Sequence, residues 1–589
     1  MKAALRALAL LLLICLPVRA ASVSYAFTTA QCVSGKAFGA PGQTCAAFPT
    51  QAPVAGSAAT AWVTMLAGGV PNAPATTTAV RLSFALGCVN PASHAGVAAS
   101  YAGVTLPLCS DHGVPPGSSG WSAPFDLTFK AGAASASMSV PTFSYADVGQ
   151  VTLMLRDAGG ATASSAAFVV KPARLAISAV TRNADGAAMP AVAKGADSGF
   201  TRVGEAFTIK AAALTSSGAV APNFGSEGAL LRLDVQLPAD AATRAAMRKL
   251  PTLGATSFAL VTGGVFSRSD FAADELGIVA VTPQLASGDY LGAGAVPATT
   301  LNVGRFYPDH FDTVSSGAMA CLDHMQCAAG VTTAAYAGQA FGVTVKPMAA
   351  GGAALLNYGG VLARPITLSA WSSAGTGSVN PGAGLLTANS IAAGASLAAT
   401  PVYSLPNPFS DSAPRANNWS VPTAIWLRAS ASENVGAASV VISSSRPPPA
   451  ASSEGAIEIV AGRLALGNPY GSELLTLPVR LEAQYWTAAR RWETSSVDNA
   501  SSVLPATISF SSCLKNLGPP CKTAVLAPVN SNSVALLAGV GTFWLKAPGA
   551  GNTGSAQFKL GSPAWLPSTG GRAVFGVFSS PLIYSREVY

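Results

Sequence analysis

Two Asp-His pairs and two cysteines lie close together near the middle of the chain. The residues are Asp309, His310, Cys321, Asp323, His324 and Cys327, and the two Asp-His pairs span sixteen residues. Imidazole and carboxylate groups together can hold Zn²⁺, or act as a general base and the group that orients it. The alternative is that "YPDHF" opens a domain and that "CLDHMQC" is a short disulfide loop with exposed polar residues. We favour this alternative and expect no metal ligand or catalytic residue here.

Elsewhere the sequence offers few residues for acid-base chemistry. It contains four histidines. Of the other two, His94 lies within the segment from Cys88 to Cys109 and His112 follows it. No G-x-S-x-G, H-E-x-x-H or P-loop phrase occurs. We therefore expect that the protein is not an enzyme, with no catalytic, cofactor-binding or metal-binding residues and no cofactor.

Aromatic residues near the C-terminus form a second candidate site. They are Tyr485, Trp486, Trp492 and Trp565. Such side chains can stack against sugar rings, but in strands they more often fill a core or the rim of a sandwich. We expect packing, and keep a sugar-stacking platform as the alternative.

The N-terminal segment "MKAALRALALLLLICLPVRA" has Lys2 and Arg6 before an apolar run and small residues at its end. This pattern predicts a secretory signal peptide over residues 1–20 and export through the Sec pathway. We expect the mature chain in the periplasm, on the outer surface or associated with a pilus. No later segment has the 18 uncharged apolar residues of a membrane-spanning helix, so we expect none after cleavage.

The nine cysteines include Cys15, which lies in the predicted signal peptide. The other eight form close sequential pairs: Cys32 with Cys45, Cys88 with Cys109, Cys321 with Cys327, and Cys513 with Cys521. An even number in an exported chain indicates disulfides, and we expect these four local bridges. A zinc site is disfavoured because paired C-x-x-C spacing is absent.

Composition narrows the class of protein further. Only 10 % of the residues are charged, and the net charge of +8 is spread over 589 residues with no basic run longer than two. We therefore expect no nucleic-acid partner. Short β-branched runs such as "FGVTVKP" alternate with Gly, Pro, Asn and Ser, a pattern typical of β-sandwiches. Residues 238–250 form the one persuasive helical segment.

A repeat divides the chain. "VGEAFTI" and "AGQAFGV" place Phe207 and Phe341 134 residues apart, and Asn223 and Asn357 have the same offset. The sequence therefore predicts an all-β fold of tandem Ig-like sandwich domains with little helix. We place the domains at residues 21–170, 171–304 (repeat 1), 305–455 (repeat 2) and 456–589. The proline-rich segment 443–455 is expected to mark the last joint.

Several phrases resemble one bacterial family. "VGRFYPDHF", "NYGG", "GRLALGNPYGSELLTLPVRLEAQYW" and "AVFGVFSSPLIYSREVY" are similar to the C-terminal domain-of-unknown-function region of the MshQ-type proteins, across roughly residues 145–589. The chain departs from the family at "TSSVDNASS", which lacks a cysteine, and at a shortened stretch between "AWLP" and "GRAVFG". The resemblance implies a role in biogenesis of the mannose-sensitive haemagglutinin (MSHA) type IV pilus, without a defined biochemical activity.

From these observations we expect an exported structural or adhesive component of the cell surface that is associated with such a pilus. Its partners would be pilus or outer-membrane surface proteins, bound by strand addition or domain docking, with surface glycans as a further class. The alternative is a secreted ligand-binding or glycan-binding protein, and after it a glycan-active enzyme.

Overall fold

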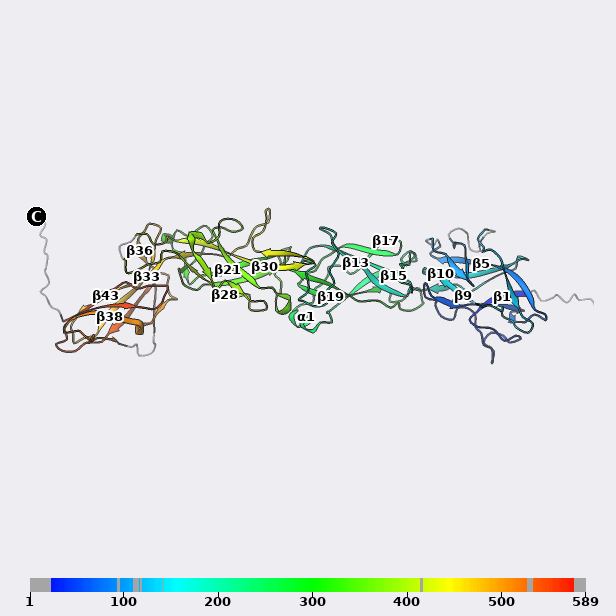
Figure 1. Ribbon diagram of the computed structural model, residues 1–589, viewed down its shortest axis with the longest axis horizontal. Coiled ribbons are helices and arrows are strands. Elements are labelled where there is room, and N and C mark those ends of the chain that lie inside the picture. Colours follow the sequence, from blue (N-terminus) through cyan, green and yellow to red (C-terminus); the bar gives the residue numbers. More distant parts are fainter. Residues whose placement is uncertain are drawn as a thin grey trace, which may run out of the picture.

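The computed structural model describes residues 23–92, 96–109, 116, 119–139, 141–413, 417–526 and 533–576. Four lobes follow one another along a single axis, in sequence order from the blue to the red end of Figure 1. Each lobe is a β-sandwich, and the fold is all-β, as predicted. The predicted signal peptide and the histidines His94 and His112 lie outside the described residues.

The first sandwich holds the longest loops. Its strands are β1 (Val23–Thr28), β2 (Ala58–Thr60), β3 (Trp62–Ala67), β4 (Val70–Pro71), β5 (Thr78–Asn90), β6 (Ala99–Tyr101), β7 (Val104–Thr105), β8 (Phe125–Phe129), β9 (Thr142–Tyr145), β10 (Gly149–Asp157), β11 (Thr162–Ser164) and β12 (Phe168–Val170). Strands β11, β10, β5 and β8 form one sheet, and β12 pairs with β10.

The second sandwich is the most regular. Its elements are β13 (Arg174–Arg182), β14 (Thr201–Arg202), β15 (Phe207–Leu214), β16 (Leu231–Gln236), α1 (Ala241–Ala246), β17 (Ala259–Thr262), β18 (Val265–Phe271), β19 (Gly277–Leu285) and β20 (Leu301–Tyr307). Helix α1 is capped by the Asp240 side chain, which accepts a hydrogen bond from the Thr243 N–H. It ends before the predicted residue 250: the backbone is extended at Met247, and the Arg248 and Lys249 N–H groups donate to the Asn357 side-chain oxygen.

The third sandwich has extra short strands and 3₁₀ turns. Its elements are β21 (His310–Ser316), β22 (Met319–Ala320), η2 (Asp323–Met325), β23 (Thr333–Tyr336), β24 (Gly342–Met348), η3 (Gly360–Leu362), β25 (Ile366–Trp371), η4 (Pro381–Ala383), β26 (Leu385–Thr387), β27 (Ser390–Ile391), β28 (Ala398–Ala399), β29 (Val402–Ser404), β30 (Thr423–Val435), β31 (Ala438–Ser443) and β32 (Ala456–Val460).

The fourth sandwich closes the described chain. Its elements are β33 (Gly462–Leu466), β34 (Tyr470–Gly471), β35 (Leu477–Trp486), β36 (Trp492–Thr494), β37 (Ser502–Val503), η5 (Pro505–Thr507), β38 (Ile508–Lys515), β39 (Val525–Leu526), β40 (Val534–Ala535), β41 (Val540–Leu545), β42 (Gly554–Leu560) and β43 (Gly571–Phe575).

The second, third and fourth sandwiches share a strand order. In one sheet of each sandwich the strand order is β14-β20-β19-β16 (second), β23-β32-β30-β25 (third) and β34-β43-β42-β38 (fourth). In each of these sheets the first strand named is short and runs parallel to its neighbour, which is the last strand of that sandwich in the sequence. The facing sheets read β13-β15-β18-β17, β21-β24-β28 and β33-β35-β41-β39. Phe207 opens β15 and Phe341 directly precedes β24, which are equivalent strands. The 134-residue offset therefore relates equivalent positions in two sandwiches.

Consecutive sandwiches are joined almost without linkers. Three residues separate β12 from β13, two separate β20 from β21, and one separates β32 from β33. Two predicted boundaries shift as a result. Strand β20 pairs with β14 and β19, so the second sandwich extends to Tyr307, and β32 pairs with β23 and β30, so the third extends to Val460.

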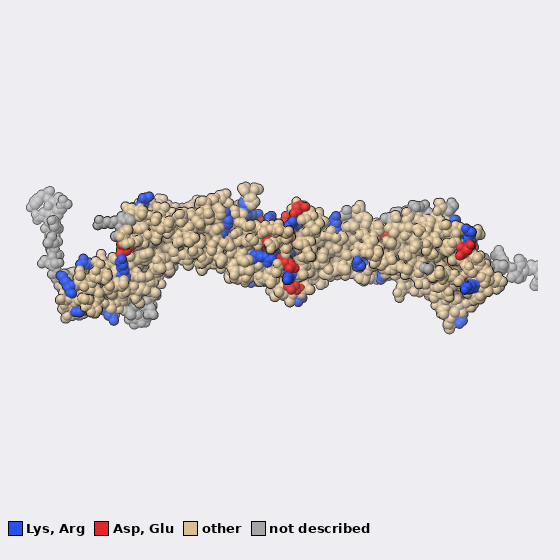
Figure 2. Space-filling model, in the orientation of Figure 1, with Lys and Arg blue, Asp and Glu red and all other residues tan. Residues whose placement is uncertain are grey.

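Alternate side chains of the strands fill the cores of the sandwiches. In β10 and β30 every second residue is buried, as expected for strands that pack one face against a partner sheet. Figure 2 shows a surface with few charged side chains; the largest mixed group of acidic and basic ones lies near the middle of the rod, and others lie at both ends. The described residues contain no helix long and apolar enough to cross a membrane.

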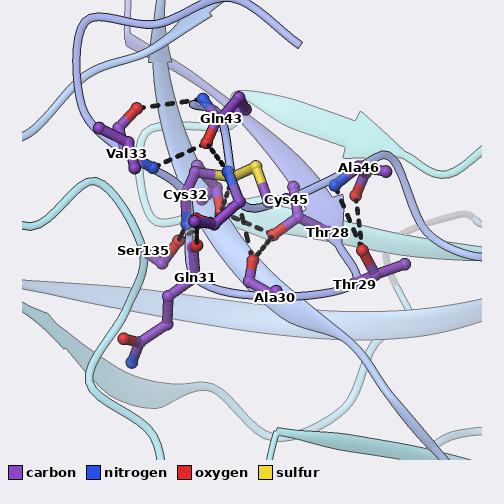
Figure 3. Close-up of a disulfide and its surroundings, with 12 residues drawn as sticks. Thr28, Thr29, Ala30, Gln31, Cys32, Val33, Gln43, Cys45, Ala46 and Ser135 are labelled. Carbon is purple, nitrogen blue, oxygen red and sulfur yellow. Dashed lines mark hydrogen bonds between the residues drawn. A yellow bond between two sulfur atoms is a disulfide. The ribbon is translucent and has the colours of Figure 1, made fainter. Parts of the chain in front are cut away.

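Disulfides join Cys32 to Cys45, Cys88 to Cys109, Cys321 to Cys327 and Cys513 to Cys521, as predicted. The first is shown in Figure 3, where the Gln43 side chain accepts from the Val33 N–H and donates to the Val33 carbonyl oxygen. These bonds cross-link the connection between β1 and β2, which has little regular secondary structure, and the Cys32 N–H donates to the Ser135 hydroxyl outside it at 2.9 Å.

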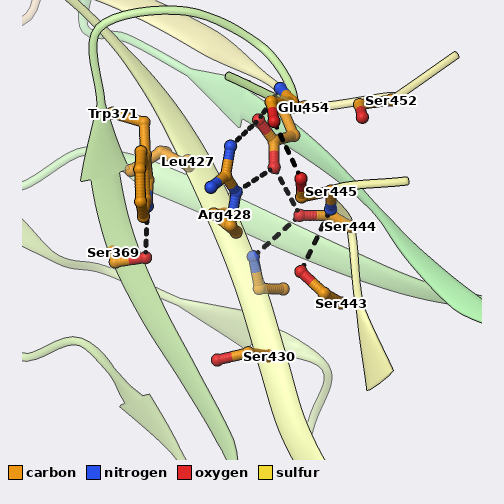
Figure 4. A network of polar contacts seen from close by, with 12 residues as sticks. Ser369, Trp371, Leu427, Arg428, Ser430, Ser443, Ser444, Ser445, Ser452 and Glu454 are labelled. Atoms are coloured by element: carbon orange, nitrogen blue, oxygen red, sulfur yellow. Dashed lines mark hydrogen bonds and ion pairs between the residues drawn. The ribbon is translucent and has the colours of Figure 1, made fainter. Parts of the chain in front are cut away.

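The proline-rich segment is not a joint, contrary to the prediction. It connects β31 to β32, and both strands belong to the third sandwich. In Figure 4 the Arg428 guanidinium lies between the Trp371 ring, 3.8 Å from its centroid, and the Glu454 carboxylate, to which its Nε donates at 2.8 Å. The Glu454 carboxylate also accepts from the Ser444 hydroxyl, so the end of the segment is fixed to the sheet.

Candidate functional site at the domain joints

The two Asp-His pairs are not brought together. Asp309 and His310 lie where the second and third sandwiches meet, and Asp309 faces Arg202 of the second sandwich at 3.7 Å. Asp323 and His324 lie on η2, next to Met325, which packs into the hydrophobic cluster of the fourth sandwich. The pairs therefore sit at opposite ends of the third sandwich, and no group of three or more potential metal-ligating residues occurs in the described parts of the chain.

The His310 side chain is buried among side chains of the joint between the second and third sandwiches. Its ring is buried and its Nδ1 lies 2.8 Å from the Asp309 carboxylate, while Asp309 also faces Arg446 at 3.6 Å. The Cys321–Cys327 loop exposes Asp323 and His324, as expected, and its buried Met325 anchors it to the fourth sandwich. Both pairs thus belong to the two ends of the third sandwich that contact its neighbours.

The joint between the first and second sandwiches is built around a buried carboxylate. Asp147 lies between β9 and β10, and its Oδ1 accepts from the Val148 N–H at 2.8 Å and from the Asn223 N–H of the second sandwich at 3.0 Å. The Asn223 amide group donates to the Tyr145 hydroxyl at 3.1 Å. Gly149 has φ +127°, and a Cβ there would lie 2.6 Å from the Asn90 carbonyl oxygen, so the tight approach requires glycine.

The next joint repeats this arrangement. Glu275 lies between β18 and β19, and its Oε1 accepts from the Leu276 N–H at 2.9 Å and from the Asn357 N–H of the third sandwich at 3.2 Å. Its Oε2 accepts from the Leu356 N–H at 2.9 Å. Asn357 is equivalent to Asn223, so the repeated asparagine marks the same joint contact twice.

A buried ion network strengthens the second of these joints. Glu433, near the end of β30, pairs with Arg305 of β20 and with Arg364 at 3.2 Å. Arg305 Nη2 also donates to the Leu362 carbonyl oxygen at 2.5 Å. The side chains of Arg305 and Glu433 are completely buried, so neither charge contacts solvent.

The third joint is aromatic. Phe409 and Trp419, from the connection between β29 and β30, pack against Trp486 and Trp492 of the β35–β36 hairpin in the fourth sandwich. The Trp419 and Trp486 ring centroids are 4.8 Å apart and nearly perpendicular, and those of Trp486 and Trp492 are 5.2 Å apart. Arg463 lies 4.3 Å above the Trp492 ring, and burial lowers its pKa to about 10.

These contacts describe the surroundings of three of the four C-terminal aromatic residues. Trp486 and Tyr485 are buried, and Trp492 packs between domains, so packing is the observed environment of all three. Trp565 lines a cavity of about 290 Å³ beside Gly338 and Ala461, again where the third and fourth sandwiches meet. The sequence indicated aromatic packing but missed that most of it joins two domains.

The joint acids were also missed as functional residues. The phrases around Gly149 and Gly277 were visible in the sequence as an acidic residue, an apolar residue and glycine before a strand. Nothing local shows that the carboxylate receives backbone N–H groups from the next domain. The one available signal was that both phrases precede a repeated asparagine, Asn223 and Asn357, which could have indicated a contact between the acid and the asparagine.

The fold and joints define a tandem Ig-like β-sandwich protein. Among solved structures, a three-domain I-band fragment of titin (I67–I69) is 7 % identical, covers 64 % of this chain and 95 % of its own, and has a TM-score of 0.18. A Salmonella alpha-2-macroglobulin mutant is 10 % identical, covers 91 % of this chain and 30 % of its own, and has a TM-score of 0.13. No curated protein matches the sequence significantly.

Two family models match the sequence itself. Residues 275–452 match the third domain of DUF6701, and residues 460–588 match its fourth domain. The two ranges together cover more than half of the 589 residues. The chain therefore belongs to the DUF6701 family.

Proposed function

We propose that the protein is an exported structural or adhesive rod of the cell surface that works with a type IV pilus system of the MSHA kind. The observation that carries the proposal is the construction of the joints. Consecutive sandwiches are separated by one to three residues, and each interface is filled by side chains from both neighbours. A chain built in this way holds its ends at a fixed separation, which suits a spacer or stalk.

Three further features support this proposal. The four disulfides are typical of chains that fold outside the reducing cytoplasm. The N-terminal sequence has the pattern of a secretory signal. The phrases shared with the MshQ-type proteins fall largely in the part of the chain that matches DUF6701.

Partners would dock at sheet edges and at the ends of the rod. Strands β17 and β38 each end a sheet, so each has an unpaired edge within that sheet order. An unpaired edge can accept an extended segment of another chain through main-chain hydrogen bonds. The buried tryptophans at the third joint give no support to the glycan-binding alternative, because a sugar needs an accessible ring face.

The direct test is to locate an epitope-tagged chain in cells that produce the pilus. We expect the tag in the outer-membrane or sheared-pilus fraction, and we expect added protease to remove it from intact cells. A matched variant lacking residues 2–20 should stay in the cytoplasm. Recovery of the full-length chain only in the cytoplasm, or unchanged pilus number and cell adhesion after deletion of its gene, would refute the proposal.

A further inference from the structure

The two acidic joints differ in how completely the carboxylate is satisfied. At the joint between the second and third sandwiches, both oxygens of Glu275 accept backbone hydrogen bonds. At the joint between the first and second, Asp147 Oδ1 accepts two, but the buried Oδ2 has no partner. Asp147 is completely buried, so water cannot replace the missing donor from the surface.

A second carboxylate with an unpartnered oxygen lies at the same joint. Glu227 follows Asn223 in the connection between β15 and β16, and its Oε1 accepts from the Tyr290 hydroxyl at 2.5 Å. Its Oε2 is buried without a partner, and the residue is only 7 % exposed. Asn90 of the first sandwich donates from its side chain to the Glu227 carbonyl oxygen at 3.2 Å, so Glu227 lies against that domain.

The surroundings supply no compensating positive charge. The titratable groups that face the two carboxylates are Tyr145 of β9 and Tyr290 from the connection between β19 and β20. Within the described ranges, no Lys, Arg or His forms an ion pair with Asp147 or Glu227. Burial raises the pKa of Asp147 to about 6, with the charge of Glu227 adding to the rise, and burial also raises the pKa of Glu227.

Two buried carboxylates with free oxygens and no cation are strongly disfavoured when both are ionised. A single proton on either carboxyl group removes one of the two buried charges and gives that group a hydrogen-bond donor. We propose that Asp147 and Glu227 together retain one proton when the joint is docked, and that loss of this proton weakens the docking of the first sandwich on the second.

The sign of the effect follows from the direction of the shifts. The docked state binds the proton more tightly than a separated, solvated pair does, so docking is favoured at low pH. The docking of the first sandwich on the second weakens as the pH rises to about 6, and it does not change further at higher pH. The joint between the second and third sandwiches serves as the comparison, because both oxygens of Glu275 already accept backbone hydrogen bonds.

The test is hydrogen exchange of the full mature chain, measured at about pH 5 and about pH 7.5 and corrected for the intrinsic pH dependence of exchange. The protection factors of the Val148 and Asn223 amides should fall about tenfold over this range, because one proton leaves the docked joint with an apparent pKa near 6. The Leu276 and Asn357 amides serve as the internal reference. In a Glu458→Gln background, where Glu458 of the third sandwich no longer titrates, their protection factors should be unchanged.

Amide variants of the two acids test whether a proton causes the change in protection. Asp147→Asn keeps an oxygen that can accept from Val148 and Asn223, and it replaces the titrating oxygen by a donor. In this variant the protection factor of the Asn223 amide should equal, at both pH values, the one that the wild type shows at about pH 5. Glu227→Gln should give the same result. Glu275→Gln, the matched control, should lower protection at the other joint at both pH values, because the Leu356 N–H loses its acceptor.

Two results would overturn the proposal. One is equal pH dependence at both joints, or none at either. The other is that Ca²⁺ restores protection at about pH 7.5 and a chelator removes it, because the pair would then hold a cation instead of a proton.

Discussion

Glu433 and Arg305 carry opposite charges that are both fully removed from solvent. Because each charge depends on the other, Arg305→Met should leave Glu433 with only Arg364 and lower the free energy of unfolding by about 3 to 5 kcal/mol. Urea unfolding of the full chain would measure this loss. The matched control is Arg480→Met, which removes the more exposed partner of Glu482 and should cost less than about 1 kcal/mol. Equal costs for the two variants would contradict the role assigned to the buried pair.

Glu458 on β32 provides a second test at the residue scale. Burial raises its pKa from 4.5 to about 7, so the folded chain binds this proton more tightly than the unfolded chain. Its contribution to the free energy of unfolding is therefore full below about pH 4.5 and is lost as the pH rises to 7, by roughly 3 kcal/mol.

Glu458→Gln removes this titration. The difference in unfolding free energy between wild type and variant should change in favour of the variant as the pH rises through that window. Taking the difference cancels contributions from other groups such as Asp147. A difference that does not depend on pH would show that Glu458 titrates normally.

At the scale of the elements, each disulfide closes a short segment of the chain. The Cys88–Cys109 bridge closes a separation of 21 residues and Cys321–Cys327 a separation of 6. Chain entropy alone predicts a stabilisation of roughly 3.4 kcal/mol for the larger loop and roughly 2.4 kcal/mol for the smaller.

Paired serine substitutions measure these contributions. Loss of Cys321–Cys327 should in addition disturb the fourth sandwich, because Met325 of that loop packs into its cluster. Near-ultraviolet circular dichroism of the tryptophans at the third joint would report the disturbance. An unchanged spectrum, with the loss of stability confined to the third sandwich, would argue against this coupling.

The same elements show what the sequence can and cannot predict. Alternating apolar residues, turn residues and the 134-residue repeat were enough for the all-β class and the equivalence of Phe207 and Phe341, because these patterns are local. The cysteine pairs were predictable for the same reason. Domain ends were misplaced by three and five residues, since one strand ends a sandwich and the next begins almost immediately.

The joints depend on contacts between residues that are far apart in the sequence. Asp147 meets Asn223 and Glu275 meets Asn357 only after two domains have folded. Trp486 looked like an ordinary core residue because its partner Trp419 belongs to another sandwich. Sequence patterns identify residues that must be buried, but they do not tell which domain buries them.

At the scale of the whole molecule, the structure is a row of four sandwiches with no flexible linker among the described joints (Figure 1). The first two joints use an acid and an asparagine, and the third uses aromatic rings. All three connect the segment before one long strand of a sandwich to a loop of the next sandwich. We expect such joints to limit bending between neighbouring sandwiches, as the proposed role of a spacer requires.

The central claim is therefore that the mature chain is a stiff rod, and small-angle X-ray scattering of the full chain in solution tests it most directly. We expect one rigid arrangement, that of Figure 1, to account for the scattering curve. A variant with a Gly-Ser insertion after Pro172 provides the comparison, since its first sandwich should move freely and shorten the average dimension. If the wild-type curve instead requires a mixture of bent arrangements like that of the insertion variant, the joints do not hold the domains and the rod account is wrong.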